Sequence, residues 1–242
     1  MKSLVFAFML FAVSAAAQSI TLAEWDAMSI DNKRLLPKYG HHPKSASQLA
    51  SDQRFLDETM ALPQFKNDRH AASNHMIGLG FEYLYRGDLK TAMYRFNQAY
   101  LLDSTNTDIY WGYGAVYMTL QDYQRARTQY LEGLALDSTN THLLTDYSTY
   151  HLVQFFGLQD LPDGIVENKK EQVEQPLDSA LTLLLKSYRL DPNDQSTTYK
   201  LSTVYYYKDD CANAKRYLHE SQKLGGRNVT KAYTADLKKK CR

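Results

Sequence analysis

The sequence predicts an all-α protein, a right-handed superhelical solenoid of helix–turn–helix repeats. One pattern of 34 residues is written twice between residues 73 and 140, and the run 103–107 recurs letter for letter at 137–141. Gly80 lies over Gly114 in the two copies, where two helices would cross closely. The other matched positions are aromatic or small: Tyr83 and Tyr117, Ala92 and Ala126, Phe96 and Tyr130.

These matched positions resemble the tetratricopeptide repeat (TPR) family, whose 34-residue repeats each form two helices. The resemblance implies about four TPR repeats, at 73–106, 107–140, 141–194 and 195–228, within a solenoid domain of residues 73–242. It also implies capping helices at both ends of the solenoid, because terminal repeats lack a neighbour. The C-terminal cap is expected at 228–241.

The third repeat is longer than the others. Counted from Thr141, the small residue of its second helix is expected at position 160, but the match stands at Ala180. About twenty residues are therefore inserted, at about 151–175. Such an insert forms either a loop on one face, often the binding face, or an elongated helix pair. The sequence leaves both alternatives open.

Residues 18–72 form an N-terminal segment without the repeat pattern. A short amphipathic turn or helix is expected around Trp25, followed by a loop at 34–43 that proline and glycine interrupt. A helix is then expected to begin near Ser45 and to end before Pro63. This helix would cap the solenoid by covering the open apolar face of the first repeat.

Residues 1–17 have the pattern of a secretory signal peptide. Lys2 gives the positive start, an apolar run extends over 4–13, and three alanines at 15–17 suit a cleavage site before Gln18. The apolar run is shorter than the roughly 20 residues that a membrane-spanning helix needs. We therefore expect an exported mature protein, periplasmic or secreted, without a transmembrane segment.

Export would make Cys211 and Cys241 a candidate disulfide, since both remain after removal of the signal peptide. Cys211 opens one predicted helix and Cys241 closes the next antiparallel one, so the two ends should be neighbours. The bridge would contribute about 3–4 kcal/mol by the loop-entropy estimate. The alternative is a pair of free thiols.

Charge and motifs argue against catalysis and nucleic-acid binding. The chain has 28 Lys and Arg against 27 Asp and Glu, so no overall field favours nucleic acid. No nucleophile motif or phosphate-binding glycine loop occurs. The pair His41–His42 could centre a metal site or hydrolase, but adjacent histidines in an extended segment point in opposite directions. We expect no catalytic residue, no metal, no cofactor and no enzymatic activity.

The resemblance to TPR proteins also implies a binding surface. In the family, the first helix of each repeat lines a concave groove, with its second, fifth, ninth and twelfth residues pointing inward. When these positions are transferred to this sequence, their residues make an aromatic and uncharged groove. It differs from the grooves of family members that bind the C-terminal carboxylate of a peptide through basic side chains. The expected groove residues are Asn74, Ile77, Phe81, Asp108, Trp111, Met118, His142, Tyr199 and Tyr206.

These features predict an exported scaffold that binds a partner protein or peptide through the groove. The alternative function is a carbohydrate- or cell-wall-binding module that uses Trp111 and the tyrosines as sugar platforms. Structurally, the alternative is that the N-terminal segment or the insert fills the groove and buries its side chains.

Overall fold

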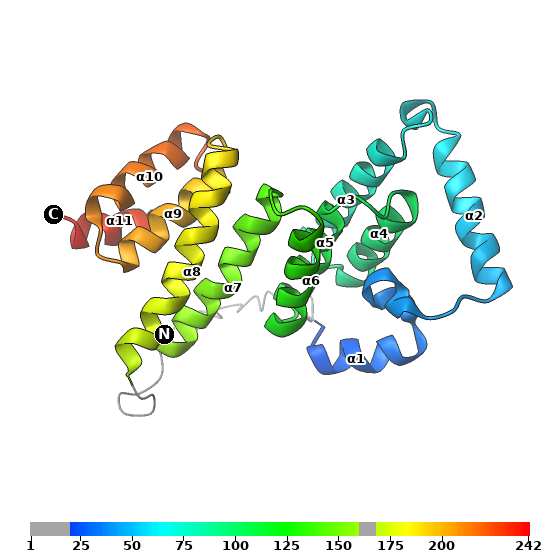
Figure 1. Ribbon diagram of the computed structural model, residues 1–242, viewed down its shortest axis with the longest axis horizontal. Helices are drawn as coiled ribbons and strands as arrows, with labels where there is room; N and C mark the ends of the chain where they lie inside the picture. Colours follow the sequence, from blue (N-terminus) through cyan, green and yellow to red (C-terminus); the bar gives the residue numbers. More distant parts are fainter. Residues whose placement is uncertain (1–19, 160–167) are drawn as a thin grey trace, which may run out of the picture.

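The computed structural model describes residues 20–159 and 168–242. These residues form eleven α-helices and three short 3₁₀ helices, with no strand among them (Figure 1). The predicted all-α class is confirmed. The predicted signal peptide and part of the predicted insert lie outside the described residues.

Eight helices form four consecutive pairs, one pair for each predicted repeat. Figure 1 shows these pairs following one another along the longest axis of the molecule, as expected for a solenoid. The pairs are α3 (Arg69–Tyr85) with α4 (Leu89–Leu102), α5 (Asp108–Thr119) with α6 (Tyr123–Leu136), α7 (Thr141–Gln159) with α8 (Lys169–Leu190), and α9 (Gln195–Tyr207) with α10 (Cys211–Lys223).

Glycines at matched positions let the two helices of a pair approach closely. A Cβ atom placed on Gly80 would lie 2.4 Å from the ring of Phe96. One placed on Gly114 would lie 2.2 Å from the ring of Tyr130. Both rings are almost completely buried, so each fills the space that the missing side chain leaves. The repeat therefore requires glycine here for packing rather than for a special backbone conformation.

Aspartates cap the second helices of the first, second and fourth repeats. The Asp88 carboxylate accepts a hydrogen bond of 3.0 Å from the Thr91 N–H, and Asp122 accepts one of 3.0 Å from the Arg125 N–H. An aspartate at this position satisfies a backbone donor that the helix leaves free. The short turn and the cap together explain why each of these second helices begins directly after its aspartate.

The copied Asp-Ser-Thr-Asn run closes each repeat. Asn106 Nδ2 donates hydrogen bonds to Ser73 Oγ at 3.1 Å and to Asn74 Oδ1 at 2.7 Å. Asn140 Nδ2 makes the equivalent bond of 2.7 Å to Asp108 Oδ1. These bonds fix each turn to the first helix of its own repeat. Because the next repeat begins directly after the turn, they also position the first helix of that next repeat.

The described part of the predicted insert extends a helix pair. Helix α7 has 19 residues and α8 has 22, against 12 and 14 for α5 and α6. Leu152, Phe155 and Leu177 are buried where the two long helices pack together. Of the two alternatives, the elongated helix pair is therefore the one observed for these residues.

The N-terminal segment packs on the second helices of the first two repeats. It comprises α1 (Leu22–Asp31), the 3₁₀ helices η1 (Lys33–Leu35) and η2 (Pro37–His41), α2 (Ala46–Met60) and the 3₁₀ helix η3 (Pro63–Phe65). Trp25 is fully buried, and Leu35 is 1% exposed. Asp26 pairs with Arg125 of α6 through two bonds of 2.5 and 2.9 Å. Lys38 pairs with Glu132 of the same helix.

Helix α2 of this segment stands beside α3 and α4 at one end of the molecule (Figure 1). Its apolar residues Phe55, Leu56 and Met60 pack against the core of the first repeats. Most of its other side chains are exposed, because no further element covers its outer face. The helix thus covers the open side of the first repeat with one apolar stripe.

At the other end, α11 (Lys231–Lys240) packs against α9 and α10. Tyr233 lies between Tyr199 and Tyr206, with ring centroids 5.4 and 5.7 Å away. Cys211 and Cys241 form a disulfide with Cα atoms 5.4 Å apart, as predicted. The bond joins the start of α10 to the end of α11 and holds this last helix in place.

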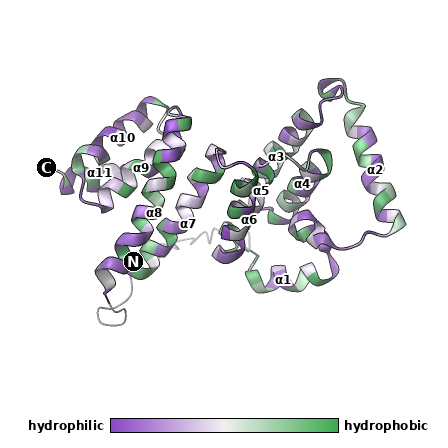
Figure 2. Cartoon of the chain, viewed as in Figure 1, coloured by the Kyte–Doolittle hydropathy of each residue, from purple (hydrophilic) through white to green (hydrophobic). Residues whose placement is uncertain are grey.

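Hydropathy follows position in the solenoid. Figure 2 shows α5 as a strongly hydrophobic segment and α10 as a mainly hydrophilic one. Helix α5 has neighbours on both sides, whereas α10 lies near the end of the solenoid and has an open face. Among the described helices, none combines the length and the apolar character needed to cross a membrane.

Candidate functional site

The first helices α3, α5, α7 and α9 contact one another in order and form one continuous surface, called here the first-helix face. All of the predicted groove residues lie on these four helices. In the N-terminal segment, η1 and η2 pack on α4, whereas α2 and η3 also contact α3. The described part of the insert is helical. The rings that contact the Trp111 indole come from α3 and α7 and from neither of these segments.

A stack of three rings crosses the first three repeats on this face. The Trp111 indole lies between Phe81 of α3 and His142 of α7. The ring centroids are 3.9 Å apart for Phe81 and Trp111, and 4.3 Å apart for Trp111 and His142. The imidazole is nearly parallel to the indole, at 14°, whereas the Phe81 ring is tilted from the indole by 37°. Three residues that are far apart in the sequence are therefore brought together, and their rings contact one another.

Polar contacts fix the indole further. Trp111 Nε1 donates a hydrogen bond of 2.5 Å to Asp146 Oδ2 on α7. The other carboxylate oxygen of Asp146 pairs with Lys200 of α9 at 2.7 Å, and Lys200 also donates to the carbonyl of Thr145 at 3.2 Å. Trp111 thus links α5 to α7 directly and to α9 through one carboxylate. Its ring has a single position, which prepares the face for binding.

His142 forms a second polar link at the edge of the stack. Its Nδ1 lies 3.0 Å from Asp108 Oδ1. The hydrogen bond to Asp108 raises the pKa of His142 and outweighs the opposing effect of burial. Burial works against the charged form of Asp108, but hydrogen bonds from His142 and Asn140 outweigh it and lower the pKa of that carboxyl. The pair is therefore an ion pair when the imidazole is protonated.

The predicted groove residues differ in accessibility. Ile77 and Phe81 are 5% and 8% exposed and belong to the core, so they offer little surface to a partner. Asn74 is exposed, although its amide oxygen accepts the bond from Asn106. The remaining residues are at least partly exposed: Asp108, Trp111, Met118, His142, Tyr199 and Tyr206.

Three residues of this face were missed by the sequence analysis. Asp146 and Lys200 stand at the sixth position of their repeats, where the first two repeats have glycine. This change to opposite charges in neighbouring repeats was the signal that could have identified them. Tyr85, at the end of α3, is 80% exposed and had no signal because it lies outside the inward-pointing positions.

The histidine pair of the N-terminal segment does not lie on this face. His41 and His42 are both exposed, at the end of η2. Within residues 20–159 and 168–242, no group of three His, Cys, Asp or Glu side chains is placed to hold a metal ion.

No known protein family and no curated protein matches this sequence. Among solved structures, the chain is similar to TTC0263, a thermophilic TPR protein of Thermus thermophilus, with a TM-score of 0.53 and 14% identity over 64% of this chain and 75% of that one. It is less similar to MamA, with a TM-score of 0.43 and 14% identity over 78% of this chain and 98% of MamA.

The first of these similarities and the four helix pairs show that the chain has the fold of a TPR protein, a helical-repeat solenoid.

Proposed function

We propose that the protein is a non-catalytic TPR scaffold that is exported and binds a partner protein or peptide through its first-helix face. The observation that carries this proposal is the fixed stack of Phe81, Trp111 and His142 across three repeats. Aromatic side chains held in one position are favourable contact residues, because binding then costs little side-chain entropy.

The accessible side chains around the stack define the contact area. Tyr85 projects from the end of α3, and Met118 of α5 is partly exposed. Asp108 and His142 add hydrogen-bonding groups at the opposite edge of the stack. A peptide lying across the first helices would meet apolar surface with polar groups beside it, which is the usual composition of a peptide-binding surface.

A sugar platform is a poorer fit to this geometry. Stacking of a sugar requires an open aromatic face, whereas the indole of Trp111 lies between two other rings. Tyr199 and Tyr206 are likewise engaged by Tyr233 of the last helix. The first-helix face therefore offers ring edges and small apolar surfaces, which suit a protein or peptide better.

Export is supported by the N-terminal pattern and by the cysteines. Residues 1–17 have a positive start, an apolar run and small residues, as in secretory signal peptides. The only two cysteines of the chain are joined in the disulfide, which suits an oxidising compartment.

The test compares two double variants of the full-length chain. Tyr85→Ala with Met118→Ala removes side chains of the first-helix face and keeps all three rings of the stack, although the Tyr85 ring lies 6.1 Å from that of Phe81. Leu131→Ala with Leu136→Ala removes exposed side chains of α6 and serves as the matched control. Partners captured from an envelope extract by the wild type are identified, purified and titrated against all three proteins.

The expected result is a dissociation constant at least about tenfold higher for the first-helix variant, with the control unchanged. Equal affinity of all three proteins, or a loss only in the α6 variant, would refute the assignment of the face. Saturable binding of cell-wall glycan fragments by the wild type, lost in the first-helix variant, would favour the carbohydrate module instead.

A further inference from the structure

A strained turn lies on the opposite side of the solenoid from the first-helix face. Four consecutive residues have left-handed backbone conformations: Lys38, Tyr39, Gly40 and His41, with φ of 54°, 58°, 64° and 55°. Only the glycine adopts this region freely, and each of the others costs about 1–2 kcal/mol. Strain of this kind persists only where the surroundings enforce it, and it is frequent at ligand sites.

Two buried residues of the solenoid enforce the turn. Asn97 of α4 accepts a hydrogen bond of 2.8 Å from the Lys38 N–H. Its Nδ2 donates to the carbonyls of Arg34 and Leu36, at 2.9 and 3.0 Å. The Tyr113 hydroxyl donates to Asn97 Oδ1 at 2.7 Å. Asn97 is 1% exposed and Tyr113 is fully buried, so the turn is held by the core of the repeats.

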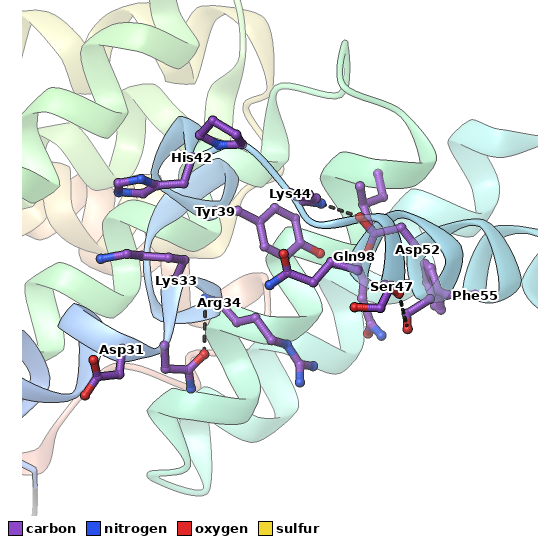
Figure 3. Close-up of a pocket in the computed structure, with 15 residues that line it drawn as sticks. Asp31, Lys33, Arg34, Tyr39, His42, Lys44, Ser47, Asp52, Phe55 and Gln98 are labelled. Atoms are coloured by element: carbon purple, nitrogen blue, oxygen red, sulfur yellow. Dashed lines mark hydrogen bonds and ion pairs between the residues drawn. The ribbon is translucent and has the colours of Figure 1, made fainter.

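The turn forms one wall of a cavity of about 450 Å³. The other walls are η1, the first ten residues of α2 and the C-terminal part of α4. Figure 3 shows the side chains around the opening. A cavity of this size suits a small molecule. The apolar part of its lining consists of Tyr39, Phe55 and Leu101.

Arg34 is a cationic group of the cavity that is available to bind a ligand. Its guanidinium carbon lies 4.0 Å from the centre of the Tyr94 ring, which holds the planar group in one orientation. Among the described residues, no carboxylate pairs with it. Lys44, in contrast, is paired with Asp52 across the cavity. An arginine held flat and without a carboxylate partner can receive an oxyanion through two parallel hydrogen bonds.

The charge of the lining limits the ligand to a single negative charge. Three cationic side chains, Lys33, Arg34 and Lys44, stand against the two carboxylates of Asp31 and Asp52. With the imidazole of His42 neutral, one positive charge is left uncompensated, which matches a carboxylate better than a doubly charged phosphate. Uncharged hydrogen-bonding groups complete the lining, among them Asn32, Ser47, Gln48, Ser51 and Gln98.

We propose that this cavity binds a small amphipathic monocarboxylate. Its carboxylate pairs with Arg34, and its apolar body lies on Phe55 and Leu101, since the Lys44 ammonium lies 3.4 Å from the centre of the Tyr39 ring. The strained turn positions the Tyr39 ring at the cavity wall, which gives a physical reason for retaining it. The carboxylate belongs either to a free organic acid or to the C-terminus of a short peptide. This site is independent of the proposed partner surface, because it lies on another face and uses other residues.

The test is isothermal titration of the full-length chain with matched probes. The probes are 3-phenylpropionate, its primary amide, phenyl phosphate, and N-acetyl-glycyl-phenylalanine as the free acid and the C-terminal amide. The variants are Arg34→Gln, which removes the charge, and Arg34→Lys, which keeps the charge but not the two parallel donors. Arg54→Gln, on an exposed part of α2 outside the lining, is the control.

We expect saturable binding of a free acid with a dissociation constant below about 1 mM, and no binding of either amide. Arg34→Gln should weaken binding about tenfold or more, Arg34→Lys by less, and Arg54→Gln not at all. The stronger of the two acids identifies the source of the carboxylate.

Three outcomes would overturn the proposal: no saturable binding of either acid, equal binding of acid and amide, or unchanged affinity in Arg34→Gln. Tighter binding of phenyl phosphate than of both acids would also refute it, since the lining would then favour a dianion. Circular dichroism of Arg34→Gln is expected to match the wild type. If the spectrum of Arg34→Gln differs from that of the wild type, the affinity of Arg34→Lys alone decides whether the two parallel N–H donors of Arg34 bind the carboxylate.

Discussion

The imidazole of His142 lies parallel to the indole of Trp111, with ring centroids 4.3 Å apart. His142 also pairs with Asp108, which lies one turn before Trp111 on α5. One side chain of the third repeat therefore contacts the second repeat at two points, one aromatic and one charged. His142 and the hydrogen bond from Trp111 to Asp146 together join these two first helices.

The stability of this contact should depend on pH. The pKa of His142 is raised from its ordinary value of 6.5 by the Asp108 hydrogen bond. Because the pKa is raised in the folded state, the ion pair stabilises the protein fully at pH values below the pKa of the unfolded state. This stabilisation is lost as the pH rises through the pKa of the folded state. The free energies of unfolding of the wild type and of His142→Phe can be compared by urea denaturation. The advantage of the wild type should be larger at about pH 5.5 than at about pH 8.5.

The control for this prediction is Asp108→Asn, which removes the charge partner and keeps a polar side chain. In that background, the pH dependence of the His142→Phe effect should largely disappear. The lowered pKa of Asp108 keeps its carboxylate charged over the whole tested range, since its ordinary value is 3.8. An equal stability difference at both pH values would contradict the ion pair.

Alanine substitutions at two glycines of the repeats should have opposite effects. Gly114→Ala places a methyl group 2.2 Å from the Tyr130 ring and should destabilise the protein by about 1–3 kcal/mol. Gly78→Ala, in a helix with nothing within 4 Å of the new atom, should stabilise it by about 0.5–1 kcal/mol. Chemical denaturation of both variants checks the sign, and destabilisation by Gly78→Ala would contradict the packing described.

Loss of the disulfide should loosen the last helix. Cys211 and Cys241 close a loop with a sequence separation of 30, which corresponds to about 3–4 kcal/mol in the loop-entropy estimate. The double variant Cys211→Ala with Cys241→Ala should show faster hydrogen exchange in α11 and unchanged exchange in α3 to α6. A reductant should reproduce the effect in the wild type and have none in the variant. Unchanged exchange in α11 would mean that Tyr233 and Leu237 hold the helix alone.

Relief of the strained turn should stabilise the protein. His41 has φ of 55° and an exposed side chain, so glycine would relieve the backbone strain at this position without loss of a buried contact. Glycine also gives the unfolded chain more freedom, which offsets part of this gain. The net increase in the free energy of unfolding of His41→Gly should be about 0.5–1 kcal/mol. His42 has an ordinary φ of −74°, so His42→Gly should not stabilise and serves as the matched control. Thermal or urea unfolding measures both, and a loss of stability in His41→Gly would show that the histidine itself is needed.

The sequence was sufficient to predict the repeats because their causes are local. Gly114 must face the ring of Tyr130, and Asp122 must cap the helix that carries this ring. These requirements recur at a fixed spacing and leave a visible pattern. The elongated third pair was one of two alternatives, because apolar residues such as Phe155 are compatible with both a helix and a packed loop.

The position of the N-terminal segment could not be predicted, because it depends on contacts between distant residues. Asp26 pairs with Arg125, and the turn at Lys38 is held by Asn97. Nothing in residues 20–42 indicates which face of the solenoid they cover. The same limit applies to Trp111: its sequence position placed it on the first-helix face, but the rings on either side of it belong to two other helices.

The placement of the N-terminal segment has a consequence for how the molecule comes apart. Linear repeat arrays can open one unit at a time, since each unit touches only its neighbours. Here the ion pair between Asp26 and Arg125 joins the N-terminal segment to the second unit, and Asn97 joins it to the first. Trp25 and Leu35 share one continuous core with both units. The apolar cores around Leu184 and Leu237 are separate from it. Under denaturant or mechanical load, the C-terminal half should open first, while the N-terminal half melts as a single cooperative block.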